Sequence, residues 1–343
     1  MQGYDAVRKT SGFVDRSGSG RLRITGPDRA AWLQGLLTND IAALTPGTGC
    51  YATFLTAQGR MISDMRVLEC GEFMLLDVPA GRQADVRERL ERFIITEDVA
   101  IEDVKDVLGR VGVYGPSSPE ILERLFSTLP DEAHQWTSLR DYDNRHASFA
   151  AQPAIVAASR KIGHGDIYGF DLYVPTESVE PLVETLAAAD VERLDDEAWH
   201  TLRVEAGRPL FGVDMDTDTI PLEAGIEERA ISFTKGCYVG QEVIIRVMHR
   251  GGGRVAKRLV GFEALSADAW SSSHWLQAGA PLFAGERQIG TLTSHAFSPW
   301  LSRAIALGYV HRDFTEPGTV VRVGASGEHE ARLTALPFVG PSA

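Results

Sequence analysis

Residues 232–243, SFTKGCYVGQEV, bring a lysine, a cysteine, a tyrosine and a glutamine close together in the chain. A cysteine reacts as its thiolate, which a neighbouring cation or a helix N-terminus stabilises. Cys237 follows closely after Lys235. The β-branched residues of 243–250 fit a strand, but the length of the segment from Gly240 and its basic end before a run of glycines favour a helix. Cys237 is therefore a candidate reactive thiol. The alternative is a small buried core side chain, because no histidine stands beside it as a base.

A group of carboxylates precedes this segment. The acidic residues of 202–226 alternate with leucine, isoleucine, valine and phenylalanine, and they are Glu205, Asp214, Asp216, Asp218 and Glu223. Such charge runs usually form solvated loops. The interleaved apolar residues indicate instead that some of these carboxylates lie near apolar surface, where burial or pairing shifts their pKa values.

Length and composition limit the possible functions. The chain has 343 residues, more than the ~250–300 at which a single core stops growing, so we expect two or three domains. Its net charge of −13 and the lack of any run of Lys or Arg argue against direct nucleic-acid binding. The first thirty residues contain no apolar signal segment, and no stretch approaches the ~18 apolar residues of a membrane span. We therefore predict a cytoplasmic protein with no membrane partner.

The other two cysteines are interpreted as structural residues. The chain has 3 cysteines, no CxxC pair and no histidine at metal-ligand spacing, so we predict no metal site. Cys50 and Cys70 lie beside strand-like alternation and are interpreted as core or strand-end residues.

The spacing of apolar residues predicts an α+β fold. Residues 21–25 and 29–37 predict a strand followed by a helix, and residues 49–79 predict a meander of antiparallel strands. A helix at 81–94 and a strand at 99–104 follow. Residues 109–189 then repeat a similar alternation of strands and helices, which favours α+β layers over a doubly wound parallel sheet.

The sequence pattern changes after the glycines at 251–253. Short strands separated by Gly- and Ser-rich turns predict a small β-barrel or sandwich. We therefore divide the chain into a first region, residues 1–251, and a C-terminal β-barrel domain, residues 252–343.

Several motifs together resemble one family. They are LRVEAGRPLFGVDMD, IPLEAGI and ISFTKGCYVGQEVI in the middle of the chain, ITGPDRAAWLQGLLTNDIAAL and AQGRMISDMRV near the N-terminus, and GTLTSHAFSPWLSRAIALGYV near the C-terminus. This pattern resembles the YgfZ-type folate-binding proteins, relatives of the glycine-cleavage T-protein (aminomethyltransferase). The resemblance implies a T-protein-like fold in which two α+β portions, possibly discontinuous in sequence, surround a central folate channel and a β-barrel follows.

The resemblance also implies a function. It implies a tetrahydrofolate-binding accessory protein that supports assembly or maintenance of iron–sulfur clusters, including those of tRNA-modifying enzymes. Its partners would then be a folate and iron–sulfur client enzymes or assembly proteins. Two alternatives remain open: an aminomethyltransferase-like one-carbon transferase that uses tetrahydrofolate, and a folate-binding scaffold without chemistry.

The resemblance also implies roles for individual residues of this sequence. Asp64 falls where the family has a carboxylate that faces the reacting nitrogens, so Asp64 and Cys237 are the candidate catalytic residues. Asp171 matches a pterin-binding glutamate, and a carboxylate can accept paired N–H donors. Trp199 is a departure, since T-proteins have an arginine there for the glutamyl carboxylate of folate. The further candidate folate-binding residues are Glu205, Lys235, Tyr238 and Gln241.

Overall fold

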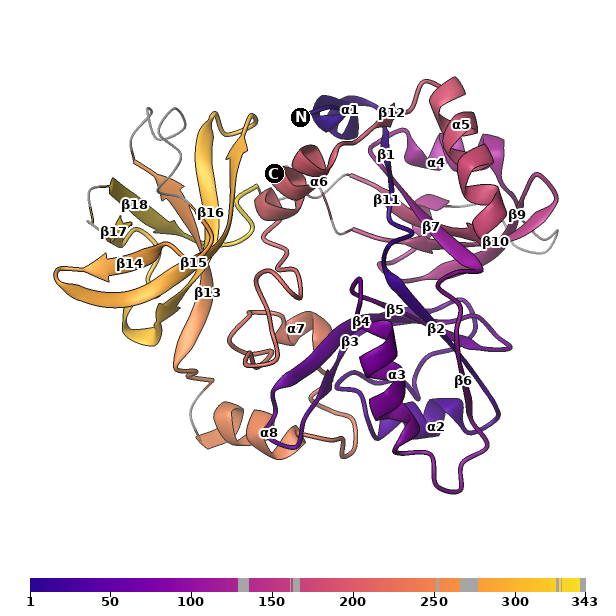
Figure 1. Ribbon diagram of the computed structural model, residues 1–343, viewed down its shortest axis with the longest axis horizontal. Helices are drawn as coiled ribbons and strands as arrows, with labels where there is room; N and C mark the ends of the chain where they lie inside the picture. Colours follow the sequence, from indigo (N-terminus) through magenta and orange to yellow (C-terminus); the bar gives the residue numbers. More distant parts are fainter. Residues whose placement is uncertain are drawn as a thin grey trace.

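The protein consists of two β-sheets and a closed β-barrel, which Figure 1 shows arranged around the middle of the molecule. The computed structural model describes residues 1–128, 136–160, 162, 167–250, 253–265, 277–324, 327 and 329–339. The predicted α+β fold with a C-terminal barrel is confirmed. No helix in these ranges is both long enough and apolar enough to cross a bilayer.

The first sheet has seven strands and combines the N-terminus with the middle of the chain. Helices α4 (Ser118–Leu125) and α5 (Val179–Ala188) pack their apolar side chains into its core. In spatial order its strands are β12 (Glu192–Arg193), β1 (Gly12–Asp15), β7 (Leu108–Tyr114), β11 (Gly169–Pro175), β10 (Gln152–Ala158), β9 (Asn144–Phe149) and β8 (Ser127–Thr128). Because β1 pairs with both β7 and β12, this sheet is discontinuous in sequence.

The second sheet has five strands and lies between the two parts of the first in sequence. It contains the predicted meander, whose consecutive strands pair antiparallel. Helices α2 (Arg29–Gln34) and α3 (Gln83–Glu91) cover its core. In spatial order its strands are β3 (Gly49–Leu55), β4 (Met61–Glu69), β5 (Met74–Val78), β2 (Gly20–Thr25) and β6 (Ala100–Asp103). The predicted helix at 29–37 is shorter than expected and ends at Gln34.

A connecting segment with little strand links the sheets to the barrel. Its first helix, α6 (Asp196–Glu205), begins where the Asp195 carboxylate accepts the Ala198 N–H at 2.7 Å and ends before Gly207, whose φ is +60°. The remaining short elements are α1 (Tyr4–Lys9), α7 (Glu227–Ala230) and the 3-10 turns Trp136–Ser138, Thr176–Ser178 and Arg312–Phe314.

Helix α8 (Gln241–Arg250) confirms the helix predicted after the cysteine segment. It packs on the turn between β3 and β4. Gly59 in that turn has φ of +74°, and a Cβ there would lie 2.9 Å from the Val243 side chain. Only glycine fits this contact without strain, so the turn and α8 are held close together.

The C-terminal strands close into a barrel because the last strand pairs with the first. In spatial order they are β13 (Lys257–Ala264), β16 (Arg303–His311), β15 (Arg287–Ser298), β14 (Pro281–Ala284), β17 (Val320–Val323) and β18 (His329–Thr334). The expected division between residues 251 and 252 stays a prediction; the first barrel strand begins at Lys257.

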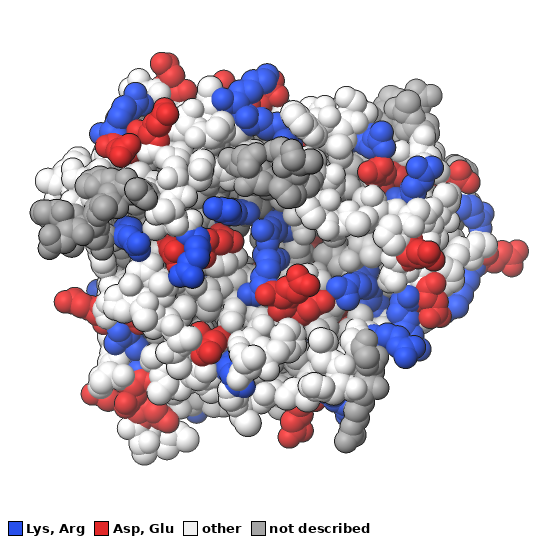
Figure 2. All heavy atoms as spheres, turned by 180° about the vertical axis from the view of Figure 1, so that it is seen from behind, with Lys and Arg blue, Asp and Glu red and all other residues white. Residues whose placement is uncertain are grey.

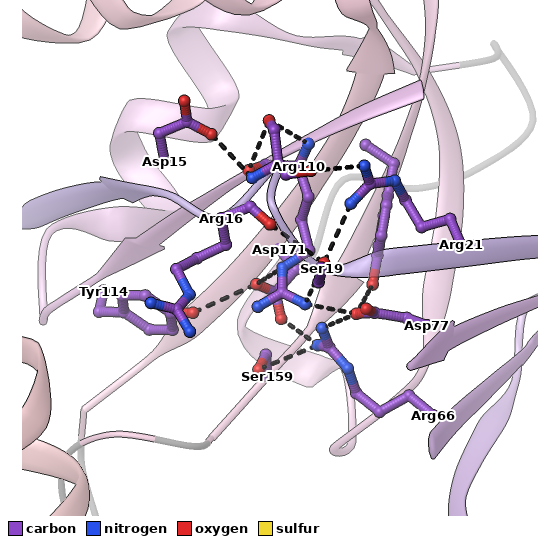
Figure 3. A network of polar contacts seen from close by, with 12 residues as sticks. Asp15, Arg16, Ser19, Arg21, Arg66, Asp77, Arg110, Tyr114, Ser159 and Asp171 are labelled. Atoms are coloured by element: carbon purple, nitrogen blue, oxygen red, sulfur yellow. Dashed lines mark hydrogen bonds and ion pairs between the residues drawn. The ribbon is translucent and has the colours of Figure 1, made fainter. Parts of the chain in front are cut away.

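Four buried charged side chains join the two sheets, and we call them the charge ring. Arg66 and Asp77 come from β4 and β5 of the second sheet, and Arg110 and Asp171 come from β7 and β11 of the first (Figure 3). Each is at most 4% exposed. Arg66 pairs with both carboxylates, and Arg110 does the same at 2.6 Å to Asp77 and 3.2 Å to Asp171. The two positive and two negative charges of the ring therefore balance between the sheets.

We expect Arg66→Met to destabilise the protein by about 3–5 kcal/mol, because it leaves two buried carboxylates with one arginine. Denaturant unfolding followed by circular dichroism measures the change. The control is Arg92→Met, which removes an exposed helix pair with Glu88 and should leave the transition where it is. An unchanged midpoint for Arg66→Met would show that the charge ring does not hold the sheets together.

Candidate functional site

A cavity of about 340 Å³ lies where the two sheets meet α6 and the segment that follows it. This volume is in the range of small-molecule sites. Seen from the face opposite to that in Figure 1, the middle of the molecule is hollowed, and Lys and Arg side chains gather around the hollow (Figure 2). The cavity includes Asp64, and we call it the Asp64 cavity.

Asp64 projects from β4 into this cavity and is held there by Tyr51. Thr53 pairs with Asp64 across β3 and β4, so Tyr51, two residues earlier on β3, lies on the same face of the sheet. The Tyr51 hydroxyl donates to Asp64 Oδ2 at 2.6 Å. Burial and the charge of Asp64 raise the pKa of Tyr51 well above its usual value, so the hydroxyl keeps its proton. The carboxylate is thus fixed in orientation.

The surroundings of Tyr51 are aromatic and cationic. Its ring stacks on Tyr142 with centroids 6.4 Å apart and an angle of 14° between planes. The Arg229 guanidinium carbon lies 5.0 Å from the centroid of the Tyr51 ring. The same cavity is also lined by Trp199 and Phe211. A flat ligand ring could therefore stack close to the Asp64 carboxylate.

Positive charge exceeds negative charge in the lining. Seven arginines and four aspartates face the cavity, although the chain as a whole carries a net charge of −13. Arg203 is paired with Asp214 at 2.7 Å. In contrast, no acidic side chain of the described ranges pairs with Arg16, Arg208 or Arg229. Desolvation lowers the pKa of both Arg16 and Arg208. The cavity is therefore suited to a ligand with anionic groups.

Asp171, expected at the pterin, is fully buried in the charge ring and does not line the cavity. Its carboxylate accepts a hydrogen bond from Arg66 and forms an ion pair with Arg110, and the Tyr114 hydroxyl donates to it at 3.2 Å. Arg66, Arg110 and Asp77 do line the cavity. The structure therefore brings Asp171 next to the site but places its arginine partners at the surface of the cavity.

Glu205, another expected folate-binding residue, lies outside the cavity, where α6 meets the N-terminal helix and the barrel. Its carboxylate accepts the Tyr4 hydroxyl at 2.6 Å and the Ser298 hydroxyl at 2.5 Å, and it pairs with Arg8. These partners come from the N-terminal helix and from the barrel. Glu205 thus ties α6 to both.

Lys235 donates to backbone carbonyls. Its ammonium group contacts the oxygens of Gln34, Leu37 and Asn39 at 2.6, 2.6 and 2.8 Å, which uses all three of its donors. The Gln34 carbonyl belongs to the last turn of α2 and the other two follow the helix, so Lys235 satisfies carbonyls at its C-terminal end. Burial lowers its pKa to about 8.

Tyr238 and Gln241 support the same segment. The Tyr238 ring is buried in the core with Lys235 Nζ 5.1 Å from its centroid. Gln241 Oε1 accepts the Tyr238 N–H at 3.3 Å at the start of α8. Neither residue lines the Asp64 cavity.

Cys237 is exposed and is not part of the cavity lining. The other cysteines behave as predicted: Cys70 is buried and Cys50 packs against the core of the second sheet. Burial raises the pKa of each of these two thiols to about 12. Within the described ranges, no group of three His, Cys, Asp or Glu side chains is arranged to hold a metal ion. The structure brings Asp64, but not Cys237, to the cavity.

Three residues of the cavity were not predicted from the sequence: Tyr51, Arg66 and Arg16. A signal existed for Arg66, because it lies two residues after Asp64 on a strand and so shares its face. Tyr51 would have required the pairing register of β3 with β4. Arg16 stands in the turn between β1 and β2, where no periodicity indicates the direction of a side chain.

The comparisons with known proteins agree with this architecture. Residues 1–235 match the GCVT N-terminal domain, and residues 257–340 match the glycine cleavage T-protein C-terminal barrel domain. The crystal structure of aminomethyltransferase T from Bartonella henselae aligns with a TM-score of 0.84 at 23% identity, covering 98% of this chain and 88% of that one. This likeness confirms the fold.

Curated relatives are similar over almost the whole chain. An aminomethyltransferase of Streptomyces avermitilis is 32% identical over 97% of this chain and 87% of its own length. An aminomethyltransferase of Synechocystis is 30% identical over 95% of this chain and 84% of its own. These names favour the alternative, a one-carbon transferase, over the main expectation of an iron–sulfur accessory role, for which they give no support. The chain belongs to the glycine cleavage T-protein family.

Proposed function

We propose that this protein binds tetrahydrofolate in the Asp64 cavity and transfers a one-carbon group from an amine donor, as an aminomethyltransferase-like enzyme. The observation that carries the proposal is the Asp64 carboxylate, held by Tyr51 inside a cavity that also contains aromatic rings and unpaired arginines. Relatives that are 32% identical and named aminomethyltransferase support the same reaction class.

The cavity residues fit a reduced folate. Tyr51, Tyr142 and Trp199 offer flat surfaces for a fused ring and a benzoyl group. Asp77 adds a second carboxylate at the cavity wall. The excess of arginine suits the carboxylates of a glutamyl group. The donor set therefore matches a ligand that is aromatic at one end and anionic at the other.

Bound tetrahydrofolate would supply the nitrogen atoms that carry the one-carbon unit. The chain itself supplies electrostatics and orientation. The Asp64 carboxylate would stabilise the positive charge on the nitrogen that takes up the one-carbon unit and would accept the proton that this nitrogen loses, while the amine of the donor leaves with the electron pair of the broken carbon–nitrogen bond. The hydrogen bond from Tyr51 keeps the carboxylate from rotating, and the Arg229 guanidinium lies over the Tyr51 ring.

The second candidate function is the YgfZ-type accessory role in iron–sulfur cluster assembly or maintenance. The observation that favours it is Cys237, an exposed thiol in the string KGCYVGQE at the start of α8. Such a thiol is open to a partner protein. Tetrahydrofolate in the cavity is common to both functions, so the two differ in whether Asp64 or Cys237 is required.

Asp64→Asn should lower the rate of methylenetetrahydrofolate formation from an aminomethyl donor by about 10²-fold or more, because the charge at the reacting nitrogen is lost. Affinity for tetrahydrofolate, measured by titration calorimetry, should change far less. Asp218→Asn is the matched control, since Asp218 is exposed and paired with Arg60 outside the cavity. If the native protein turns over no aminomethyl donor, the transferase proposal fails.

In the native protein at pH 8, we expect iodoacetamide to modify Cys237 alone. Cys50 and Cys70 remain as buried thiols because their pKa values are about 12. Intact mass should show a single added group, and none for Cys237→Ser. All of the cysteines should react after denaturation. Rapid native modification of Cys50 or Cys70 would contradict the burial of these side chains.

A deletion strain separates the two functions. If the accessory role is correct, Cys237→Ala should bind tetrahydrofolate normally but fail to restore the activity of an iron–sulfur enzyme, whereas Asp64→Asn should restore it. If the transferase role is correct, the opposite pattern should appear in an assay for one-carbon transfer. Restoration of cluster enzyme activity by Cys237→Ala would exclude a role for this thiol.

A further inference from the structure

Two arginines without an ion-pair partner in the described ranges lie near Tyr51, the residue that holds the Asp64 carboxylate. The Arg229 guanidinium carbon is 5.0 Å from the centroid of the Tyr51 ring, whose hydroxyl donates to Asp64 at 2.6 Å. Arg208 lines the same cavity, and burial together with the charge of Arg229 lowers its pKa. Two half-buried guanidinium groups that repel one another are stabilised by a bound anion.

The protein itself balances little of this positive charge. Arg208 makes one long hydrogen bond, 3.5 Å to the Arg160 carbonyl. The charge of Asp141 acts on Arg208 without forming an ion pair, and Asp141 Oδ1 accepts the Arg160 N–H at 2.9 Å. Around Asp141, the cavity wall therefore contains one aspartate and three arginines, Arg160, Arg208 and Arg229. An anionic group of a ligand would bring this charge closer to balance.

Tyr142 adds a hydroxyl donor to the two arginines and has a strained backbone. Its φ is +72°, which bulky residues rarely adopt and which is found most often at functional sites. Its ring lines the cavity and stacks on Tyr51. Burial raises its pKa to about 12 against the opposing charges of Arg229 and Arg208, so the hydroxyl keeps its proton. This hydroxyl has no hydrogen-bond partner among the described residues. We call Tyr142, Arg208 and Arg229 the Arg208 cluster.

The Arg208 cluster is too close to Asp64 to hold the far end of a folate. In tetrahydrofolate, a benzoyl group separates the glutamyl carboxylates from the nitrogens that carry the one-carbon unit. With those nitrogens at Asp64, the glutamyl carboxylates lie at least the length of this group away. Arg229 and Asp64, in contrast, both contact the side chain of Tyr51. The cluster is therefore placed for a second and shorter molecule.

We propose that the Arg208 cluster binds the carboxylate of the one-carbon donor, and that this donor is a small amino-acid-type amine whose nitrogen lies at Asp64. This inference rests on the proposed function and names the class of its second substrate. An amino acid has a basic nitrogen and an anionic carboxylate, which match the carboxylate of Asp64 and the guanidinium groups of the cluster. When the carbon–nitrogen bond of the donor breaks, the amino acid leaves as the free amine with the electron pair of that bond.

The test compares amino acids with amino alcohols of the same length by ligand-observed NMR, on protein saturated with 5-formyltetrahydrofolate. The amino acids are glycine, β-alanine and 4-aminobutanoate, so that the spacing of amine and carboxylate varies. The native protein should bind at least one of them about tenfold or more tightly than its alcohol, as expected for a charge-assisted pair. Arg229→Gln should reduce this preference to about twofold or less, and Tyr142→Phe should weaken amino-acid binding about threefold.

Affinity for 5-formyltetrahydrofolate, measured by titration calorimetry, should stay the same in both variants, which also shows that the cavity is intact. Arg92→Gln, on the exposed face of α3, is the control and should keep the native preference. If Arg229→Gln instead weakens folate binding and leaves the amino-acid preference unchanged, the cluster holds the folate and the inference is overturned.

The folate titration separates failure of this inference from failure of the proposed function. If the native protein binds 5-formyltetrahydrofolate but prefers none of the amino acids over its alcohol, the inference fails while folate binding stands. If the native protein binds no folate, the proposed function fails. The amino-acid preference, measured without folate, then decides alone whether the Arg208 cluster is a carboxylate site.

Discussion

The charge ring of Arg66, Asp77, Arg110 and Asp171 is the constraint on which the cavity depends. Each arginine contacts both carboxylates, so the sheets cannot separate without leaving charges unpaired in a buried place. The Tyr173 hydroxyl adds a hydrogen bond to Asp77 at 2.7 Å. Since three of the four ring residues also line the Asp64 cavity, the contact that joins the sheets forms part of the wall of the site. Side chains that stabilise the fold are therefore also part of the proposed ligand site.

Other polar side chains join segments that are far apart in the sequence. Glu205 connects α6 with the N-terminal helix and the barrel, and Lys235 binds carbonyls about two hundred residues earlier in the chain. Both residues are expected at the ligand from the family resemblance, yet the structure gives each a full set of protein partners. A buried polar group needs hydrogen-bond partners wherever it lies. Its residue type alone therefore does not show whether those partners are other protein groups or a ligand.

The parts of the fold that were predicted correctly depend on neighbours in the chain. The meander of β3 to β5, helix α8 and the barrel strands follow from local periodicity and turn residues. Periodicity did not predict that α2 ends at Gln34, whose carbonyl is bound by Lys235 from a distant segment. Periodicity also does not predict the direction of the Arg16 and Cys237 side chains, because the residues around them come from distant segments of the chain. Asp64 was found because the family motif marks it, and its partner Tyr51 required the strand register.

The two candidate functions use different parts of the molecule. Asp64 lies inside a cavity with its own aromatic, cationic and carboxylate groups, while Cys237 is exposed and outside that lining. Lys235, the cation nearest to Cys237 in sequence, has its donors occupied by carbonyls and is therefore held in place for structure. A one-carbon transfer at Asp64 therefore has no need of the thiol. A partner that contacts Cys237 would meet the surface near the start of α8, because the thiol is exposed and does not line the Asp64 cavity.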